Sequence, residues 1–329
     1  MQYREFGGTG IQLSRIGLGC FSMSGAYGAA DDAESIATIH RAMERGVNLL
    51  DTSARYGGGH NHQLIGEAIK GRRDQIFIHS KTGTIRNKGD RSVAEGSGTP
   101  DRLRSICEQS LKNLGVDYLD AMCQSRVDPT VPIEESVGAV ARLAEEGKVR
   151  FIGLSEAAPE TVRRASAVHS LVSLQFEYSL WTRDVEQGHR QACEELEMAL
   201  MAYAPLGYGF LAGVVDRAGA QSEDDIRGKF PRFSEENFET NREKVTQLES
   251  FAAEKQSTAA QICLAWLLAH NDNVFPIPGC KSRKHLDENL DAIEIVLTED
   301  DLARLDRIFP KDAASGDRYP PGGMKRVNL

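Results

Sequence analysis

The strongest constraint on this chain is an eightfold alternation between short apolar segments and longer segments with helical periodicity. We interpret the apolar segments as strands, at residues 16–19, 47–51, 76–80, 118–124, 151–155, 171–177, 200–205 and 274–278. The helical segments between them are at residues 32–46, 61–71, 100–115, 132–147, 159–168, 190–198, 236–255 and 258–270. Strands that alternate with helices in this way are typical of βα units and a parallel sheet.

Eight such units in a chain of 329 residues predict an α/β fold of the (β/α)8 TIM barrel type. We expect one domain over residues 1–329, with an N-terminal β-hairpin at residues 2–15 and extra C-terminal helices at 285–293 and 298–309. A doubly wound sheet is the main alternative, but the first strand-to-helix connection, residues 17–25, lacks the G-x-G-x-x-G pattern of that fold. In a barrel, active residues lie at the carboxyl ends of the strands.

Composition limits the classes of partner. The chain has 39 basic and 48 acidic residues and a net charge of −9, which argues against nucleic acid or an anionic membrane surface as the main partner. No segment approaches the roughly 20 apolar residues of a membrane span, and the first residues show no signal-peptide pattern. The six cysteines include no Cys-x-x-Cys pair, which favours reduced thiols and no zinc site. We expect a cytoplasmic protein without a bound metal. The sequence leaves open whether the protein forms a homo-oligomer.

Three polar side chains meet at neighbouring strand ends in the predicted barrel. Asp51 ends the second strand, Tyr56 follows five residues later, and Lys81 comes directly after the third strand. Free tyrosine has a pKa of about 10, and an adjacent ammonium lowers that value, so Tyr56 beside Lys81 can donate a proton near neutral pH. Asp51 would hold the lysine charged and in place. A structural Asp–Lys ion pair with an incidental tyrosine is the alternative, but the position at the barrel rim favours catalysis.

Several motifs, in order and at consistent spacing, resemble those of the aldo-keto reductase superfamily. They are Gly17-Leu-Gly19, Asp51-Thr-x-x-x-Tyr56-Gly, Asn61-x-x-Leu-Ile-Gly66, Lys81-Thr-Gly, Ser110-Leu-x-x-Leu-Gly-Val-Asp-Tyr-Leu-Asp120, Gly153-Leu-Ser155, Ala202-Tyr-x-Pro-Leu-Gly207, and Ile277-Pro-Gly-x-Lys281 with Glu288-Asn289. The run at 126–134 resembles most the group of bacterial and plant perakine-reductase-like enzymes. The resemblance implies a (β/α)8 barrel, an extended NADP(H) and hydride transfer to an aldehyde or ketone. It also implies that Asp51, Tyr56 and Lys81 are catalytic, with Tyr56 as general acid.

The fourth catalytic position of that family departs from its usual pattern. Where relatives have Gln-His-Arg at the end of the fourth strand, this chain has Gln124-Ser125-Arg126. Serine keeps one hydroxyl donor but lacks the reach of imidazole and its titration near neutral pH. Ser125 is then a weaker donor in a slow or substrate-restricted reductase, a mark of altered chemistry (C=C reduction, elimination or isomerisation), or an introduced substitution. His60, in the glycine-rich loop after Tyr56, is either a compensating group or a solvated loop histidine.

The resemblance also assigns positions around the cofactor. It implies that Tyr203 stacks on the nicotinamide while Ser155 and Gln175 hold its carboxamide. Backbone amides at 206–211 would bind the pyrophosphate, because glycines there permit close approach. The basic run at 281–284 suits a 2′-phosphate, so we expect NADP(H) rather than NAD(H), with a solvated basic face as the alternative. The predicted cofactor residues are Gly19, Cys20, Asp51, Ser155, Gln175, Tyr203, Pro205, Leu206, Gly207, Gly209, Leu211, Gly279, Lys281, Arg283, Glu288 and Asn289.

The predicted substrate pocket consists of Phe21, Met23, Tyr27, Tyr56 and Arg126, together with a C-terminal tail that looks irregular. The aromatic and thioether side chains suit an apolar substrate, and Arg126 would hold a carboxylate of the substrate or a structural acid such as Asp128. The predicted function is NADP(H)-dependent reduction of a small carbonyl compound. The alternatives are the altered chemistries above, or a cofactor-binding regulatory subunit like the potassium-channel β subunits, which also resemble reductases without the usual histidine.

Overall fold

The computed structural model of this chain describes residues 1–83, 96–215, 217, 225–270 and 273–329. At its centre is an eight-stranded parallel sheet. The strands are β3 (Leu18–Gly19), β4 (Leu49–Ser53), β5 (Phe77–Lys81), β6 (Leu119–Gln124), β7 (Val149–Ser155), β8 (Leu171–Glu177), β9 (Ala199–Tyr203) and β10 (Val274–Pro276). They lie in chain order across the sheet, from β3 at one edge to β10 at the other.

The two edges of this sheet meet and close it into a barrel. The backbone N–H of Gly17 donates to the carbonyl of Pro276 at 3.0 Å, and that of Gly19 donates to Pro278 at 3.0 Å. A Cβ on Gly19 would lie 2.7 Å from the carbonyl oxygen of Ile277, so the closure requires a glycine there. The predicted (β/α)8 fold is confirmed, and the doubly wound alternative is wrong.

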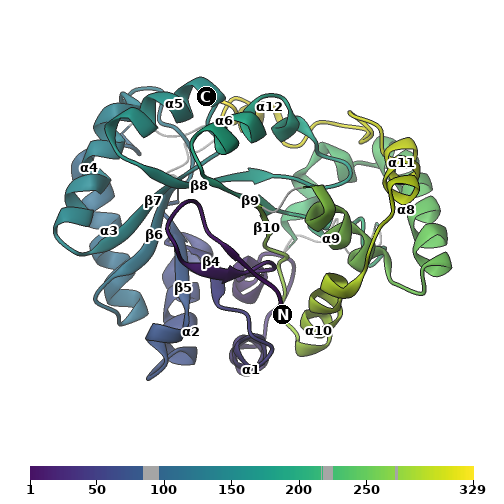
Figure 1. Cartoon of the computed structure of the whole chain (residues 1–329), viewed down its shortest axis with the longest axis horizontal. Coiled ribbons are helices and arrows are strands. Elements are labelled where there is room, and N and C mark those ends of the chain that lie inside the picture. The colour runs from purple at the N-terminus through teal and green to yellow at the C-terminus, as the bar shows by residue number, and fades with distance from the viewer. Residues whose placement is uncertain (84–95, 216, 218–224, 271–272) are drawn as a thin grey trace.

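Helices surround the barrel (Figure 1). They are α1 (Asp32–Glu44), α2 (His60–Ala68), α3 (Pro100–Leu114), α4 (Ile133–Glu145), α5 (Pro159–Val168), α6 (His189–Glu195), α8 (Glu235–Glu254), α9 (Ala259–His270), α10 (Arg283–Asp291), α11 (Glu299–Ile308) and α12 (Pro321–Met324). Those up to α11 agree with the predicted helices, apart from a few residues at their ends. In α3, for example, Pro100 takes the first position and Gly115 ends the helix at a φ of 65°.

A β-hairpin, formed by β1 (Tyr3–Glu5) and β2 (Gln12–Ser14), covers one end of the barrel as predicted. Phe6, between its strands, packs against Phe77 and Phe275, with ring centroids 5.2 Å away in both cases. Those two rings lie near the amino ends of β5 and β10. The hairpin therefore closes the amino-terminal end of the barrel, which leaves the rim at the carboxyl ends of the strands for a site.

The C-terminal segment packs against the barrel. Arg318 is 4% exposed, and α12 follows it. The backbone N–H of Asn328 donates to the carbonyl of Glu156 at 2.8 Å, and that of Ala158 donates to the carbonyl of Leu329 at 2.8 Å. Apart from α12, the segment from Pro310 is irregular as expected, but it docks on the turn that follows β7.

Three further observations concern the described residues as a whole. All six cysteines are buried and free. The described helices are too short or too polar for any of them to cross a membrane. Within the ranges given above, no group of three or more histidine, cysteine, aspartate or glutamate side chains is arranged to hold a metal ion.

Candidate active site

The predicted catalytic residues come together at the carboxyl ends of neighbouring strands. In the pairing of β4 with β5, Asp51 lies opposite His79, and Ser53 lies opposite Lys81. Tyr56 begins the short 3-10 turn that follows β4. Parallel neighbours end at the same rim, so the strand register itself brings the carboxylate, the phenol and the ammonium to one place.

Asp51 is the centre of a buried hydrogen-bond cluster. Lys81 Nζ donates to its Oδ2 at 2.5 Å. His79 Nδ1 donates to Oδ1 at 3.2 Å, and Gln175 Nε2 donates to the same oxygen at 2.6 Å. Burial acts to raise the pKa of Asp51, but Lys81 and His79 outweigh it and hold that pKa below its usual value. The carboxylate therefore stays ionised and fully hydrogen-bonded, as a buried charge must be.

Lys81 and Tyr56 form the proton-donor end of the cluster. The Lys81 ammonium lies 5.0 Å from the centroid of the Tyr56 ring. Burial acts to lower the pKa of Lys81, but Asp51 and Tyr56 outweigh it and raise that pKa above its usual value. Burial also raises the pKa of Tyr56, to about 12, against the opposing effect of Lys81. The expected net lowering of the tyrosine pKa is therefore wrong, because burial of the phenol outweighs the nearby ammonium.

Ser125 follows the end of β6, at the fourth predicted catalytic position. Its Oγ accepts a hydrogen bond from the backbone N–H of Gly83 at 2.6 Å. Its own backbone N–H donates to Thr82 Oγ1 at 3.2 Å. The side chain is thus oriented by the segment that leaves β5, and its hydroxyl hydrogen remains a donor.

His60 does not reach this cluster. Its Nδ1 accepts from the hydroxyl of Ser24 at 3.0 Å, and its Nε2 donates to Asp32 Oδ2 at 3.0 Å. Both ring nitrogens are thus committed to the loop before α1 and to its first turn. The idea that His60 replaces the absent histidine finds no support in this geometry.

His79 is the member of the cluster that sequence reasoning missed. The ring is fully buried inside the barrel, and its Nε2 accepts from Ser173 Oγ at 3.1 Å. Burial lowers the pKa of His79 despite the opposing effect of Asp51. The only sequence pattern that could have revealed it is a histidine in an apolar strand, two residues before Lys81.

Arg126 lies between two residues predicted to contact the nicotinamide. Its Nη1 donates to Ser155 Oγ at 3.2 Å, and its Nη2 donates to the Tyr203 hydroxyl at 3.4 Å. Asp128, proposed above as a structural partner, instead accepts from the backbone N–H of Gly98 at 2.9 Å. The predicted pairing of Arg126 with Asp128 is therefore wrong. The Arg126 guanidinium instead lies at the carboxyl rim of the barrel, between Ser155 and Tyr203.

The C-terminal tail supplies a second group that the sequence did not reveal. Arg318 Nη2 donates to Glu156 Oε1 at 2.5 Å, and Arg318 Nε lies 3.3 Å from Glu177 Oε2. The hydroxyls of Tyr319 and Tyr203 are 2.8 Å apart. This buried network ties the tail to the ends of β7, β8 and β9.

The glycine turn predicted to bind pyrophosphate follows β9. The N–H of Gly207 donates to the carbonyl of Ala204 at 2.9 Å, and that of Gly209 donates to Leu206 at 3.0 Å. Gly207 has a φ of +55°, and a Cβ on it would lie 2.7 Å from the indole of Trp181. Position 207 therefore requires glycine. These two amides are engaged within the turn itself.

The basic run at 281–284 lies where β10 leads into α10. Lys281 Nζ donates to the carbonyls of Tyr27 at 3.3 Å and Ala29 at 2.5 Å, and Arg283 Nη2 donates to Glu34 at 2.9 Å. Both cations thus have partners in the chain. The other predicted cofactor residues lie at the barrel closure (Gly19, Cys20, Gly279), beside the glycine turn (Pro205, Leu211) and in α10 (Glu288, Asn289).

Aromatic rings gather beside the proton donor. The Phe21 ring lies 4.5 Å from that of Tyr56 and 5.5 Å from that of Tyr27, centroid to centroid. Met23, however, is fully buried in the main hydrophobic core. Burial of the Met23 side chain in the 3-10 turn at Phe21–Ser24 gives its assignment to the substrate pocket no support, and that assignment stays a prediction.

Two local features fit a dinucleotide along this rim. Ser22 Oγ is buried and has no hydrogen-bond partner among the described residues. A Cβ built on Gly279 would meet only that hydroxyl, at 3.9 Å, so the space over Gly279 is open. The Ser155 hydroxyl and the cations at 281–284 are donors of the kind that a carboxamide and a phosphate require.

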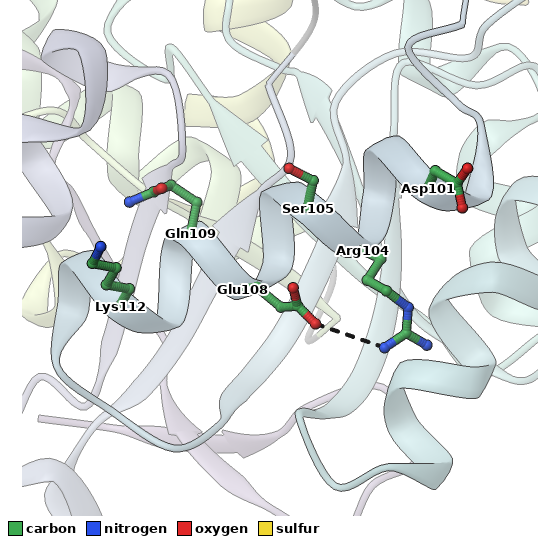
Figure 2. Close-up of a pocket in the computed structure, with 6 residues that line it drawn as sticks. All are labelled: Asp101, Arg104, Ser105, Glu108, Gln109 and Lys112. Atoms are coloured by element: carbon green, nitrogen blue, oxygen red, sulfur yellow. Dashed lines mark ion pairs between the residues drawn. The ribbon is translucent and has the colours of Figure 1, made fainter.

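A separate surface pocket, of about 360 Å3, lies on the outer face of α3. Figure 2 shows that its lining comes from this one helix, with the ion pair between Arg104 and Glu108 at 3.7 Å. Its lining residues are Asp101, Arg104, Ser105, Glu108, Gln109 and Lys112. No residue of the candidate active site lines it.

Comparison with known proteins points to one family. The profile of the Aldo/keto reductase family matches residues 15–309. Over 322 residues, the chain is 39% identical to a probable aldo-keto reductase 1 from Glycine max, which covers 97% of this chain and 92% of that protein. Among solved structures, the glycerol dehydrogenase AKR11B4 from Gluconobacter oxydans matches with a TM-score of 0.83 at 25% identity, over 97% of this chain and 98% of its own. An aldo/keto reductase from Klebsiella pneumoniae in complex with NADP and acetate matches with a TM-score of 0.72 at 27% identity, over 96% and 97% of the two chains.

Proposed function

Because this chain belongs to the aldo-keto reductase family, we propose that it is an NADP(H)-dependent reductase of a small aldehyde or ketone. The observation that carries this proposal is the cluster of Asp51, Lys81 and Tyr56 at the carboxyl rim of the barrel. The complexes of relatives with NADP and NADPH support the choice of cofactor. When bound, NADPH supplies the hydride that reduces the carbonyl carbon.

The chain's own residues handle the proton. Tyr56 donates its hydroxyl proton to the carbonyl oxygen as negative charge develops there. The Lys81 ammonium stabilises the phenolate that remains, and Asp51 keeps the ammonium in place. With a pKa of about 12, Tyr56 is protonated throughout the neutral range, which is the form that reduction needs.

Ser125 takes the orienting role in this scheme. Its Oγ is held by the N–H of Gly83, so the hydroxyl hydrogen can point at the substrate oxygen. The serine side chain is shorter than that of histidine, so its hydroxyl donor reaches less far into the site than imidazole does. We therefore expect carbonyl reduction that is slow for small aldehydes and faster for substrates that other contacts hold in place.

A second candidate function rests on the same residue. Without an imidazole at position 125, a carbonyl oxygen is less firmly oriented towards Tyr56, the proposed proton donor. Such a site also suits reduction of an activated C=C bond, in which the hydride adds to one carbon and Tyr56 protonates the other. The substrate panel below separates the two chemistries.

The test is to mix the purified protein with NADPH and a panel of aldehydes, ketones and enones, and to follow absorbance of the reduced cofactor. Tyr56→Phe is the control, because it removes the proton donor and leaves the ring. We expect oxidation of NADPH by the wild type and at least a hundredfold slower turnover by the variant. Tight NADPH binding without turnover of any substrate would contradict the proposal and favour a regulatory role.

A further inference from the structure

The position proposed for the 2′-phosphate already holds an anionic group from the chain itself. Arg283, the first residue of α10, directs three N–H groups at the carboxylate of Glu34 in α1. Its backbone N–H donates to Oε1 at 3.0 Å, its Nε donates to Oε1 at 3.2 Å, and its Nη2 donates to Oε2 at 2.9 Å. A guanidinium fork and a backbone N–H at a helix N-terminus are both groups that proteins commonly use to bind a phosphate. Glu34 therefore sits in an anion site.

We propose that Glu34 is a cofactor-specificity residue, whose carboxylate competes with the 2′-phosphate of NADP(H) for Arg283 and so reduces the preference for NADP(H) over NAD(H). This inference rests on the proposed placement of the adenosine end at residues 281–284. NAD(H) has a hydroxyl in place of the phosphate, so Glu34 does not oppose its binding.

The competition does not depend on a chance side-chain position. In Figure 1, α1 and α10 lie next to each other. Three other ion pairs join α10 to α1 and to Arg45, the residue after α1, and one of them is between Arg45 and Asp287. Arg41 Nε lies 3.1 Å from Asp287 Oδ1, and Arg45 Nη2 lies 2.7 Å from Asp291 Oδ1. These contacts hold the two helices in register, so Glu34 stays opposite Arg283 whether or not the two side chains are paired.

The other cations of the run are less suited to bind the phosphate. Lys281 is committed to two backbone carbonyls, and burial lowers its pKa. Lys284 is exposed and offers only a point charge on a flexible stem. Arg283 is thus the group on which phosphate binding depends most. Its hydrogen bonds lower the pKa of Glu34, so the competing carboxylate is ionised at neutral pH.

The effect should be moderate, because both partners are partly in water. The side chains of Arg283 and Glu34 are 58% and 32% exposed, and an exposed ion pair changes an equilibrium only a few-fold. Calorimetric titration with NADP+ and NAD+ measures it directly. We expect Glu34→Gln to bind NADP+ about two- to fivefold more tightly and NAD+ with unchanged affinity. High salt should shrink the difference.

Two further variants separate the possible explanations. Glu44→Gln makes the same charge change in α1 at an exposed position paired with Arg41 at 3.6 Å, so it should leave both affinities unchanged. Arg283→Ala should weaken binding of NADP+ alone and abolish the effect of Glu34→Gln in the double variant.

Each possible failure has a distinct meaning. If Glu34→Gln binds NADP+ no better than the wild type, or more weakly, Glu34 does not compete and instead orients Arg283. If Arg283→Ala leaves NADP+ affinity unchanged, the phosphate lies elsewhere, and both the placement and the inference fail. Normal NADP+ binding by Arg283→Ala would still leave the proposed reductase activity standing.

Discussion

Arg318 in the C-terminal tail and Glu156 after β7 form a buried ion pair, in which Nη2 donates to Oε1 at 2.5 Å and the side chains are 4% and 0% exposed. Glu156 has a φ of 58°, a left-handed conformation that favours glycine. The Tyr203 hydroxyl donates to the same Oε1 at 2.7 Å. The tail thus fixes a strained turn beside Ser155 together with the aromatic residue proposed to stack on the cofactor.

Replacement of Arg318 by alanine should destabilise the protein strongly. It would leave the carboxylate of Glu156 buried without the cation that pairs with it, a change that usually costs about 3–5 kcal/mol of the free energy of unfolding. Glu177 would lose one of its two cations and keep Arg232, whose Nη1 lies 3.4 Å from Glu177 Oε1. Denaturant unfolding measures this quantity. Arg304→Ala is the control, because Arg304 pairs with Glu254 at the surface and its loss should change stability little. The double variant Arg318→Ala/Glu156→Gln should recover part of the loss. Equal destabilisation by the two arginine variants would contradict a special role for the tail.

His62 should make the protein sensitive to acid. The ring is fully buried, and burial, with a smaller effect of Lys81, lowers its pKa from 6.5 to about 4. The unfolded chain binds a proton on this side chain at higher pH than the folded chain does. Stability is therefore complete above about pH 6.5 and falls as the pH drops towards 4, by about 3 kcal/mol in total.

The measurement is the free energy of unfolding at several pH values between 4 and 8. In His62→Gln, which keeps a hydrogen-bond donor for Ser80, the decline below pH 6.5 should be shallower. An unchanged slope would show that other groups cause the loss of stability in acid.

Ser125→His should raise the activity of the enzyme. Imidazole reaches further into the site than a hydroxyl and donates strongly to a carbonyl oxygen. We expect about a tenfold or larger gain in kcat with simple aldehydes, since a positioned acid–base group typically contributes at least that much. Ser125→Ala is the matched control and should not gain activity. Unaltered or lower kcat in the histidine variant would favour altered chemistry over slow carbonyl reduction.

The rate of reduction should not fall at alkaline pH through ionisation of Tyr56. Tyr56 must be protonated to donate, and its pKa of about 12 keeps it so. We expect kcat for reduction to be constant from about pH 7 to 10 as far as this group is concerned. Steady-state rates with saturating NADPH measure this profile. A fall in kcat centred near pH 8 or 9, accompanied by tyrosinate absorbance in the wild type but not in Tyr56→Phe, would show that the phenol titrates much lower.

The sequence by itself determined the architecture and the chemical class. The alternation of apolar and amphipathic segments specifies βα units. The apolar strand segments and the helical periodicity are both local properties of neighbouring residues, so they can be read from the sequence. Eight such units lead to a barrel, and the barrel places Asp51, Tyr56 and Lys81 at one rim. These predictions needed no knowledge of which distant side chains touch.

Only the tertiary structure decided how those groups behave. The contact of His79 with Asp51 comes from strand register, and the contact of Arg318 with Glu156 joins residues far apart in the chain. Burial also set the direction of the Tyr56 pKa shift. Hydrogen bonds and desolvation depend on neighbours that meet only in the folded chain, so no local pattern encodes them. For the same reason no local pattern showed that the carboxylate of Glu34 accepts hydrogen bonds from Arg283.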